Sequence, residues 1–216
     1  MDEYLRLAID LRTRMWRTAG ARFIAADRLT KRDRFSTFSI ALLSVVAIGV
    51  GLLDPHLSTF AQRVSGGSTA AVTAILSVFI LVLSLVEGSG QTSVRATKLH
   101  ENAVHISEVR TDLETMLARS QLANSPDWEQ LAELRKAYET RIRECPFNHD
   151  PVDYQRFQVN HRTSPEFADA EGQPRMSWPE AQWVKLHHIA DTSWLSFASW
   201  IFVVAFVVLT FAWGNY

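Results

Sequence analysis

Three long stretches without a single Asp, Glu, Lys, Arg or His constrain this chain of 216 residues more than any other feature. They cover residues 35–53, 66–86 and 192–216, and are 19, 21 and 25 residues long. A helix rises about 1.5 Å per residue, so roughly 20 residues cross a hydrocarbon core about 30 Å thick. The sequence therefore predicts three transmembrane helices. For the third run, the alternative is a buried core helix of a soluble protein.

The whole-chain averages, 47% hydrophobic residues and a net charge of −1, resemble those of a soluble domain and conceal this uneven distribution. The sequence predicts an all-α integral membrane protein, a transmembrane hairpin plus a third C-terminal span, with a cytoplasmic helical bundle. The expected segments are a cytoplasmic amphipathic helix (1–34), transmembrane helix 1 (35–53), an external loop (54–65), transmembrane helix 2 (66–86), a cytoplasmic helical region (87–191) and transmembrane helix 3 (192–213).

Basic residues flanking the spans predict their orientation, because cytoplasmic flanks are enriched in Lys and Arg. Two basic residues, Arg95 and Lys98, follow the second span, whereas residues 54–65 contain one Lys or Arg, Arg63. We therefore expect a cytoplasmic N-terminus and an external C-terminus. The basic residues that precede the first span are Arg28, Lys31, Arg32 and Arg34.

Apolar residues at steps of three and four predict helices outside the membrane as well. One stripe indicates that the second span continues as a single helix to about Ser120, and Ser125 with Pro126 is expected to start the next helix, which stops at 145–146. Residues 147–179 are predicted to be loop with one short helix near Tyr154, and 183–191 a helical lead into the third span. The stripes are Leu99, Ala103, Ile106, Leu113 and Leu117; Trp128, Leu131, Tyr138 and Ile142; and Leu5, Ile9, Trp16, Ala19, Phe23 and Ala26.

Small residues form a stripe on each of the first two predicted spans. In lipid, small side chains allow the close backbone approach that holds helices together. One interpretation is that the stripes join the two spans into a hairpin; the other is that they line or close an oligomeric pore. The stripes are Gly67, Ala70, Ala74, Ser77, Ser84 and Gly88, with Leu81, and Thr37, Ser44, Ala47 and Gly51, with Ile40.

Glu87 is the ionisable residue at the cytoplasmic edge of the second span, beside two glycines that can form a hinge. A ring of such carboxylates in an oligomer favours cations. The alternative is a carboxylate that lies in water at the membrane interface. The absence of charges at mid-depth in the three runs argues against proton pumps, ion-coupled transporters and voltage sensors.

The sequence predicts no catalytic, cofactor-binding or metal-binding residues. Its single cysteine, Cys145, excludes an intramolecular disulfide and a four-cysteine zinc site. The cluster His187, His188 and Asp191 is expected to make a local hydrogen bond rather than an active site. The Arg-rich N-terminal helix, with Trp16 and Phe23 between its arginines, is expected to contact lipid, with nucleic-acid binding as the alternative.

Several segments, taken in order, resemble the SLATT family of two-span effectors, which associate with nucleotidyltransferase and nucleotide-sensor partners in bacterial conflict systems. They are 16–23 (WRTAGARF), 36–44 (STFSIALLS), 93–103 (SVRATKLHENA) and the motif around Asn148, His149, Asp150, Asp153 and Tyr154. The subgroup that the chain most resembles is encoded beside reverse transcriptases. The motif of Asn148, His149, Asp153 and Tyr154 has no known role in the family.

The resemblance implies a pore-forming effector of the bacterial inner membrane that stays silent until a sensor detects phage and then oligomerises to depolarise the cell. It implies a homo-oligomer, a reverse transcriptase or nucleotide-signalling partner, and no cofactor. The alternative is a non-conducting membrane anchor that recruits a reverse transcriptase or another partner to the bilayer. A housekeeping channel or transporter is a third hypothesis, and the lack of buried ionisable groups counts against it.

Overall fold

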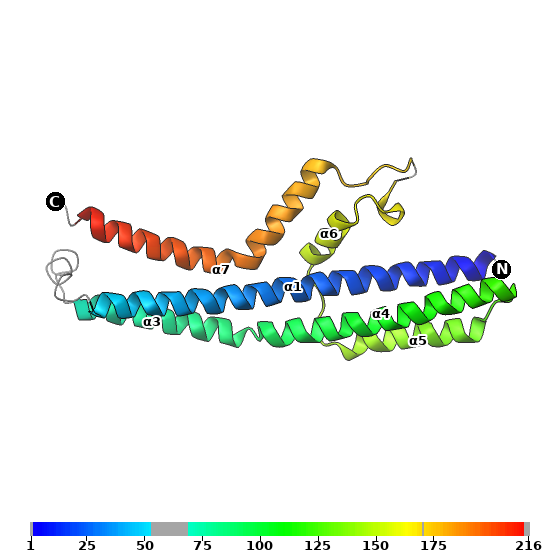
Figure 1. Ribbon diagram of the computed structural model, residues 1–216, viewed down its shortest axis with the longest axis horizontal. Helices are drawn as coiled ribbons and strands as arrows, with labels where there is room; N and C mark the ends of the chain where they lie inside the picture. Colours follow the sequence, from blue (N-terminus) through cyan, green and yellow to red (C-terminus); the bar gives the residue numbers. More distant parts are fainter. Residues whose placement is uncertain (1, 53–68, 170, 214–216) are drawn as a thin grey trace. The chain divides into compact units, whose positions relative to one another are not determined.

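The computed structural model describes residues 2–52, 69–169 and 171–213, and within these ranges the chain forms helices and no strand (Figure 1). This confirms the all-helical prediction. The one strand-like contact among the described residues is an isolated bridge between Ala168 and Pro174. The elements are α1 (Asp2–Leu52), α3 (Thr69–Ser89), α4 (Thr92–Ala123), α5 (Trp128–Glu144), α6 (Pro151–Asn160), the 3-10 helix η1 (Pro165–Phe167) and α7 (Trp178–Trp213).

The chain divides into two compact units. The first, which we call the bundle unit, takes in residues 1–29 and 93–190. The second, the apolar unit, takes in residues 30–92 and 191–216. Helix α1 contributes to both units without an interruption, and α7 also contributes to both.

The core of the bundle unit lies between the first part of α1, α4 and α5, which run side by side in Figure 1. Helices α1 and α4 contribute residues mostly three or four apart, and α5 contributes two residues seven apart, which are spacings of one helix face. A hydroxyl pair closes the core at one end, where Tyr4 Oη lies 3.0 Å from Ser120 Oγ. The buried residues are Tyr4, Ala8, Leu11, Met15 and Ala19 of α1, Ile106, Val109, Leu113, Met116 and Leu117 of α4, and Leu131 and Tyr138 of α5.

The stripe predicted for the N-terminal helix is wrong in its first part. Ile9 is 46% exposed, whereas Tyr4, Ala8 and Met15 are fully buried. The prediction failed because it placed Trp16 on the same face as the core residues. Trp16 instead packs against Phe157 of α6, with 4.9 Å between the ring centroids. Helix α1 therefore has two packing faces, and a single stripe through the largest side chains mixes them.

The stripe predicted for α4 is confirmed, since all five of its residues are buried. The prediction of one continuous helix from the second span is wrong. Helix α3 ends at Ser89 and α4 begins at Thr92, with a turn between them in which Gln91 adopts a φ of 46°. Two glycines near this point disfavour a helix, and the left-handed Gln91 breaks it.

Helix α5 begins at Trp128 with Asp127 as its N-cap, so the prediction of Ser125 in that role is wrong. The Asp127 carboxylate accepts a hydrogen bond from the Gln130 amide at 2.9 Å, the interaction that stabilises a first helical turn. The predicted end of this helix and the short helix around Tyr154 are confirmed by α5 and α6. The predicted lead into the third span is also helical, and it begins earlier, at Trp178.

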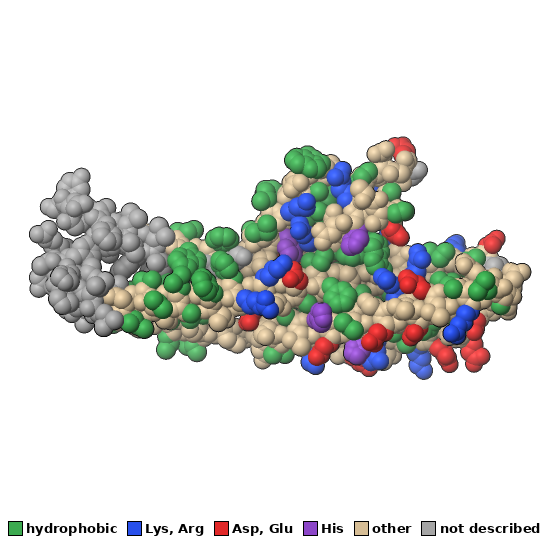
Figure 2. All heavy atoms as spheres, viewed as in Figure 1, with side chains coloured by type: hydrophobic (Ala, Val, Ile, Leu, Met, Phe, Trp, Pro, Cys, Tyr) green, Lys and Arg blue, Asp and Glu red, His purple; other side chains and the backbone are tan. Residues whose placement is uncertain are grey.

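Polarity in the apolar unit is reversed relative to a soluble domain. The second part of α1 buries Ser36, Ser39, Leu43 and Ala47, while Val45 and Ile48 are more than 60% exposed. Large hydrophobic residues are also exposed along α3, and Figure 2 shows hydrophobic side chains on the visible surface of this part of the molecule. Phe35 of α1 and Phe197 of α7 lie 6.3 Å apart between ring centroids, which joins these two helices within the unit.

Among the described residues, one helical segment, Thr73–Ala123, is long and apolar enough to cross a membrane by length and composition. This segment begins within α3, the helix on which the second span was predicted, and continues beyond the turn at 90–91 through α4. Spans on α1 and α7 remain predictions. The predicted external loop (54–65) lies outside the described residues.

Candidate functional site

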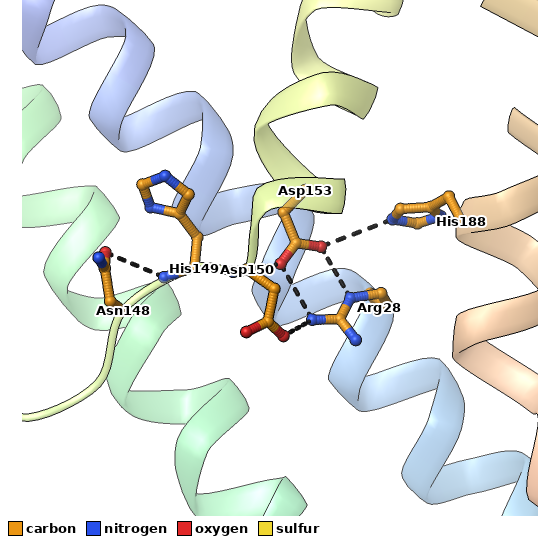
Figure 3. Close-up of polar contacts among 6 residues, drawn as sticks. All are labelled: Arg28, Asn148, His149, Asp150, Asp153 and His188. Atoms are coloured by element: carbon orange, nitrogen blue, oxygen red, sulfur yellow. Dashed lines mark hydrogen bonds and ion pairs between the residues drawn. The ribbon is translucent and has the colours of Figure 1, made fainter. Parts of the chain in front are cut away.

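A buried ionic cluster joins α1, α6 and α7 within the bundle unit (Figure 3). The guanidinium of Arg28 donates to both carboxylate oxygens of Asp153, from Nε to Oδ1 at 2.7 Å and from Nη2 to Oδ2 at 3.0 Å. It also donates to the Asp150 carboxylate. His188 approaches from α7, with Nε2 3.6 Å from Asp153 Oδ1. We call Arg28, Asp150, Asp153 and His188 the ionic cluster.

Local sequence places the two aspartates of the cluster. Asp150 is the N-cap of α6, and Pro151 occupies the first helical position, where its missing N–H costs nothing. Asp153 then stands three residues into the helix, and its carboxylate accepts from the Asp150 amide at 3.0 Å. The motif is therefore a helix start in which the capping carboxylates also bind an arginine.

The cluster keeps its charges despite its burial. Burial raises the pKa of Asp153, but His188, Arg28 and the Asp150 amide together outweigh it, so this pKa lies below its ordinary value. Burial lowers the pKa of Arg28, and the two aspartates overcome that effect and raise it. Both groups therefore stay ionised at neutral pH, and each charge is compensated by the other.

The ionic cluster is suited to holding segments together rather than to chemistry. The Asp153 side chain is fully buried and that of Arg28 is 4% exposed, so neither reaches a substrate. The two carboxylate oxygens of Asp153 are occupied by Arg28 and the Asp150 amide, and His188 lies against Oδ1. The arrangement fixes the start of α6 against α1.

The other motif residues surround the cluster without joining it. The Asn148 side chain accepts from the His149 amide at 3.0 Å. The His149 ring points away from Arg28 in Figure 3 and lies 6.4 Å from the half-buried ring of Tyr154. Burial, followed by the charge of Arg22, lowers the pKa of His149, so this imidazole is neutral at pH 7.

Sequence reasoning missed the partners of two arginines in the N-terminal helix. Arg22 and Arg28 belong to the Arg-rich helix that was expected to contact lipid, yet both are only 3% exposed. Arg22 donates to the Asn102 side chain, and Asn102 donates to the Arg141 carbonyl at 2.6 Å. The expectation is therefore wrong for these residues. Their burial could have been recognised from their place in the helix, because both arginines are within four residues of the buried Ala25 and Ala26.

The small-residue stripe on α3 is exposed at each of its positions whose burial the structure describes. Ala74, Ser77, Ser84 and Gly88 are exposed, and no atom lies within 4 Å of a Cβ added at Gly88. The buried face of α3 instead contains Leu76, with half-buried Thr73, Phe79, Ile80, Leu83 and Glu87 beside it. The four exposed stripe residues therefore do not join α3 to α1, and the interpretation of the stripe as a whole stays a prediction. Gly67 lies outside the described residues, and Ala70 belongs to α3.

The stripe predicted on α1 is only partly buried. Ala47 is buried, Ser44 is half-buried and donates to the Ile40 carbonyl at 2.9 Å, and Thr37 is exposed. The buried face is formed by Ser36, Ser39 and Leu43 together with Ala47, and Gly51 belongs to the last turn of α1.

Glu87 is not in open water, contrary to one interpretation of the sequence. Its side chain is 13% exposed, and Oε1 lies 3.8 Å from Arg32 Nη2. This ion pair lies inside the apolar unit.

The described residues contain no group of three His, Cys, Asp or Glu side chains that could hold a metal ion. The chain matches the family described as SMODS and SLOG-associating 2TM effector domain family 5 over residues 6–209. No curated protein and no solved structure matches it. The match confirms the resemblance at the level of the family, and it implies a membrane protein and an effector in antiphage or conflict systems. The chain belongs to the SMODS and SLOG-associating 2TM effector domain family 5.

Proposed function

We propose that this membrane effector forms or gates an oligomeric pore that depolarises the bacterial inner membrane. Its trigger is an associated reverse transcriptase or nucleotide-signalling partner, or the nucleic-acid or nucleotide product of that partner. In this proposal the N-terminus and the bundle unit are cytoplasmic, the C-terminus is external, and the protein has no catalytic role. Copies of the chain assemble with one another in the bilayer.

The division of the exposed surface of α3 carries the proposal. At 100° per residue, Ala74, Ser77, Ser84 and Gly88 lie on one side of the helix. Ile75, Val82 and Val86 lie on another side and are 62%, 49% and 50% exposed, while Leu81, 58% exposed, lies among the small residues. A helix surrounded only by lipid has no need of this division. Large apolar side chains suit lipid, whereas small ones suit another helix.

The small side of α3 is also weakly polar. The Ser77 hydroxyl donates to the Thr73 carbonyl at 2.8 Å, so its hydrogen bond is satisfied inside the helix. It can therefore lie in an apolar contact at rest and accept a hydrogen bond from water when helices rearrange. A stripe of this kind supports both the closed and the open state of a pore.

One observation favours the alternative, a non-conducting anchor that recruits a partner. The part of α7 within the bundle unit exposes Trp178, Trp183 and Leu186, each by more than 60%. Exposed aromatic residues suit a protein partner, and they also suit a membrane interface.

A membrane-potential measurement separates the two functions. Cells that express the chain with its genomic neighbour are loaded with a voltage-sensitive dye and infected with phage. The pore predicts depolarisation only when both the neighbour and the phage are present. Ser77→Phe is expected to abolish it, because a large ring blocks close approach on the small side, while Val82→Phe on the large side is the matched control.

Both variants are first shown to reach the membrane in wild-type amounts. If phage defence persists in Ser77→Phe cells and the potential stays unchanged until lysis, the pore is wrong and the anchor is favoured.

A further inference from the structure

The bundle unit contains a pocket of about 300 Å³ that the ionic cluster does not use. It is lined by parts of α1, α6, η1 and the segment before α7. Three arginines, Arg17, Arg162 and Arg175, line it together with the rings of Tyr154 and Phe167. We call it the arginine pocket.

Each of the three guanidinium groups is oriented by a main-chain carbonyl. Arg17 Nη2 donates to the Glu166 carbonyl at 2.9 Å, Arg162 Nε to that of Met176 at 2.7 Å, and Arg175 Nε to that of Ala168 at 2.8 Å. A guanidinium has five N–H donors, so each arginine keeps donors for a further acceptor. Arg17 also stacks on Phe167, 5.0 Å from the ring centroid, and its buried Nε has no hydrogen-bond partner among the described residues.

The lining of the pocket keeps a small positive charge, because its three arginines outnumber its two glutamates. Among the described residues, no carboxylate lies within 4.0 Å of these three guanidinium groups. Two acids also line the pocket, Glu166 and Glu180. The Glu180 carboxylate accepts from the amide and the hydroxyl of Ser177, both at 2.8 Å, which lowers its pKa and commits it to the start of α7.

We propose that the arginine pocket binds a small phosphate ester. Preoriented guanidinium groups match the oxygens of a phosphate with paired hydrogen bonds, which ammonium groups do not. Carbonyl acceptors already hold the arginines in place, so little side-chain entropy is lost on binding. The Tyr154 ring and the Gln158 amide, which also line the pocket, provide a stacking surface and a polar contact for the organic part.

The size of the pocket selects a small ligand. Its volume is at the lower end of the range of roughly 300–1,000 Å³ that small-molecule sites occupy. It therefore fits a phosphate ester of up to about the size of one nucleotide, and not a stretch of nucleic acid. The phosphate can belong to a soluble metabolite or to a lipid head group, and the inference does not depend on whether the chain conducts ions.

The full chain, purified in uncharged detergent, is titrated with inorganic phosphate and with adenosine 5′-monophosphate, and binding is measured by calorimetry. A second arm uses nanodiscs of phosphatidylcholine with and without phosphatidic acid. We expect saturable binding of both phosphate probes, with adenosine 5′-monophosphate bound more tightly than inorganic phosphate. If phosphatidic acid in the nanodiscs competes with these probes, the phosphate that the pocket binds belongs to a lipid head group.

Arg162→Gln and Arg175→Gln are each expected to weaken binding about ten-fold or more, the loss expected for one charge-assisted interaction. Arg135→Gln, which removes an exposed α5 arginine paired with Glu139, should leave it unchanged. Circular dichroism shows whether each variant is folded. Arg175→Lys keeps the positive charge but loses the paired N–H donors of the guanidinium, so it should bind with intermediate affinity.

Absence of saturable binding in both arms overturns the inference. So does binding whose affinity in Arg162→Gln and Arg175→Gln equals the affinity in the control variant Arg135→Gln. Binding of an RNA oligonucleotide without binding of either phosphate probe also overturns it.

Discussion

The two units of this protein bury opposite kinds of side chain. The bundle unit buries Leu99, Ile106 and Met116 and leaves most of its charges exposed. The apolar unit buries Ser36 and Ser39 and exposes many of its described large hydrophobic residues, among them Val45, Ile48 and Ile75. Helix α1 does both along one continuous backbone. Helix geometry is therefore not what differs between the units. The difference is the one expected if water surrounds the bundle unit and lipid surrounds the apolar unit, as in the proposed function.

Charge follows the same division. The bundle unit contains a fully buried carboxylate, Asp153, whose cost is offset by Arg28 and by the Asp150 amide. In the apolar unit, the Glu87 carboxylate lies within ion-pair distance of Arg32. Each unit thus pairs its buried charge with a residue of α1, and substitutions that remove a partner or change the surroundings test this comparison.

The largest effect is expected from Arg28→Met in the bundle unit. It leaves the Asp153 carboxylate buried without its arginine, which costs about 3–5 kcal/mol. Arg14→Met is the matched control on the same helix, because the pair of Arg14 with Asp10 is more than half exposed and contributes roughly 0–1 kcal/mol. Thermal unfolding of the purified chain, followed by circular dichroism, measures both. Equal losses in the two variants would contradict a stabilising ionic cluster.

A charge introduced on an exposed apolar residue should have opposite consequences in the two units. Val78→Arg in α3 is expected to cost about 2.5–3.5 kcal/mol of membrane insertion. Leu122→Arg in α4 should change stability by no more than about 0.5 kcal/mol, because Leu122 is 90% exposed in the bundle unit. Alkaline extraction of membranes reports insertion. Val78→Arg that remains as firmly inserted as Leu122→Arg would break the comparison.

Gly20→Ala is expected to destabilise the bundle unit by about 1–3 kcal/mol through overpacking. A Cβ there would lie 2.0 Å from Cε2 of Phe157, a ring held by Trp16 and Phe167. The control is Gly49→Ala, since Gly49 belongs to the same helix and has nothing within 4 Å of such a Cβ. Unfolding midpoints measured in the same detergent compare the two. A midpoint for Gly20→Ala at or above that of Gly49→Ala would show that α6 does not pack closely on α1.

The smallest expected effect is a dependence of bundle stability on pH. The folded pKa of His149 lies below 6.5, so the unfolded chain takes up its proton first and stability falls as the pH drops below 6.5. Asp153, whose folded pKa lies below 3.8, contributes stability above that value that is lost as the pH falls through its folded pKa. Unfolding midpoints between pH 7.5 and 3 measure both steps.

His149→Gln should flatten the upper step of this profile and leave the lower one in place. Asp153→Asn should do the reverse, at a lower overall stability. A wild-type midpoint that rises on acidification from pH 7 to 5 would mean that the pKa of His149 is not lowered as described.

The fold was predictable wherever one period dominated the sequence. The α4 stripe succeeded because Leu99, Ile106 and Leu113 repeat against one packing face. The α1 stripe failed because Tyr4 and Trp16 serve different faces. The cap at Asp127 was missed because Ser125 and Pro126 offer an equally plausible start two residues earlier.

The candidate site was less predictable, for reasons of distance in the sequence. Arg28 and Asp153 are separated by 125 residues, and no local pattern connects an arginine before a membrane span with a helix cap far away. The motif of Asp150 and Asp153 was recognisable only as a helix start. On α3 the small stripe was visible, but the side that faces α1 is set by tertiary packing, and Leu76 occupies it instead of Ser77.

Cysteine cross-linking along α3 tests the central claim most directly, the claim that its small side is a contact between copies in the membrane. Single cysteines at positions 74 to 88 are introduced into a Cys145→Ser background, and disulfide formation is measured in membranes before and after phage infection. The account predicts cross-linking that peaks at Ala74→Cys, Ser77→Cys and Ser84→Cys and is weak at Ile75→Cys, Val82→Cys and Val86→Cys. Cross-linking without this helical period, or none in either state while defence operates, would contradict it.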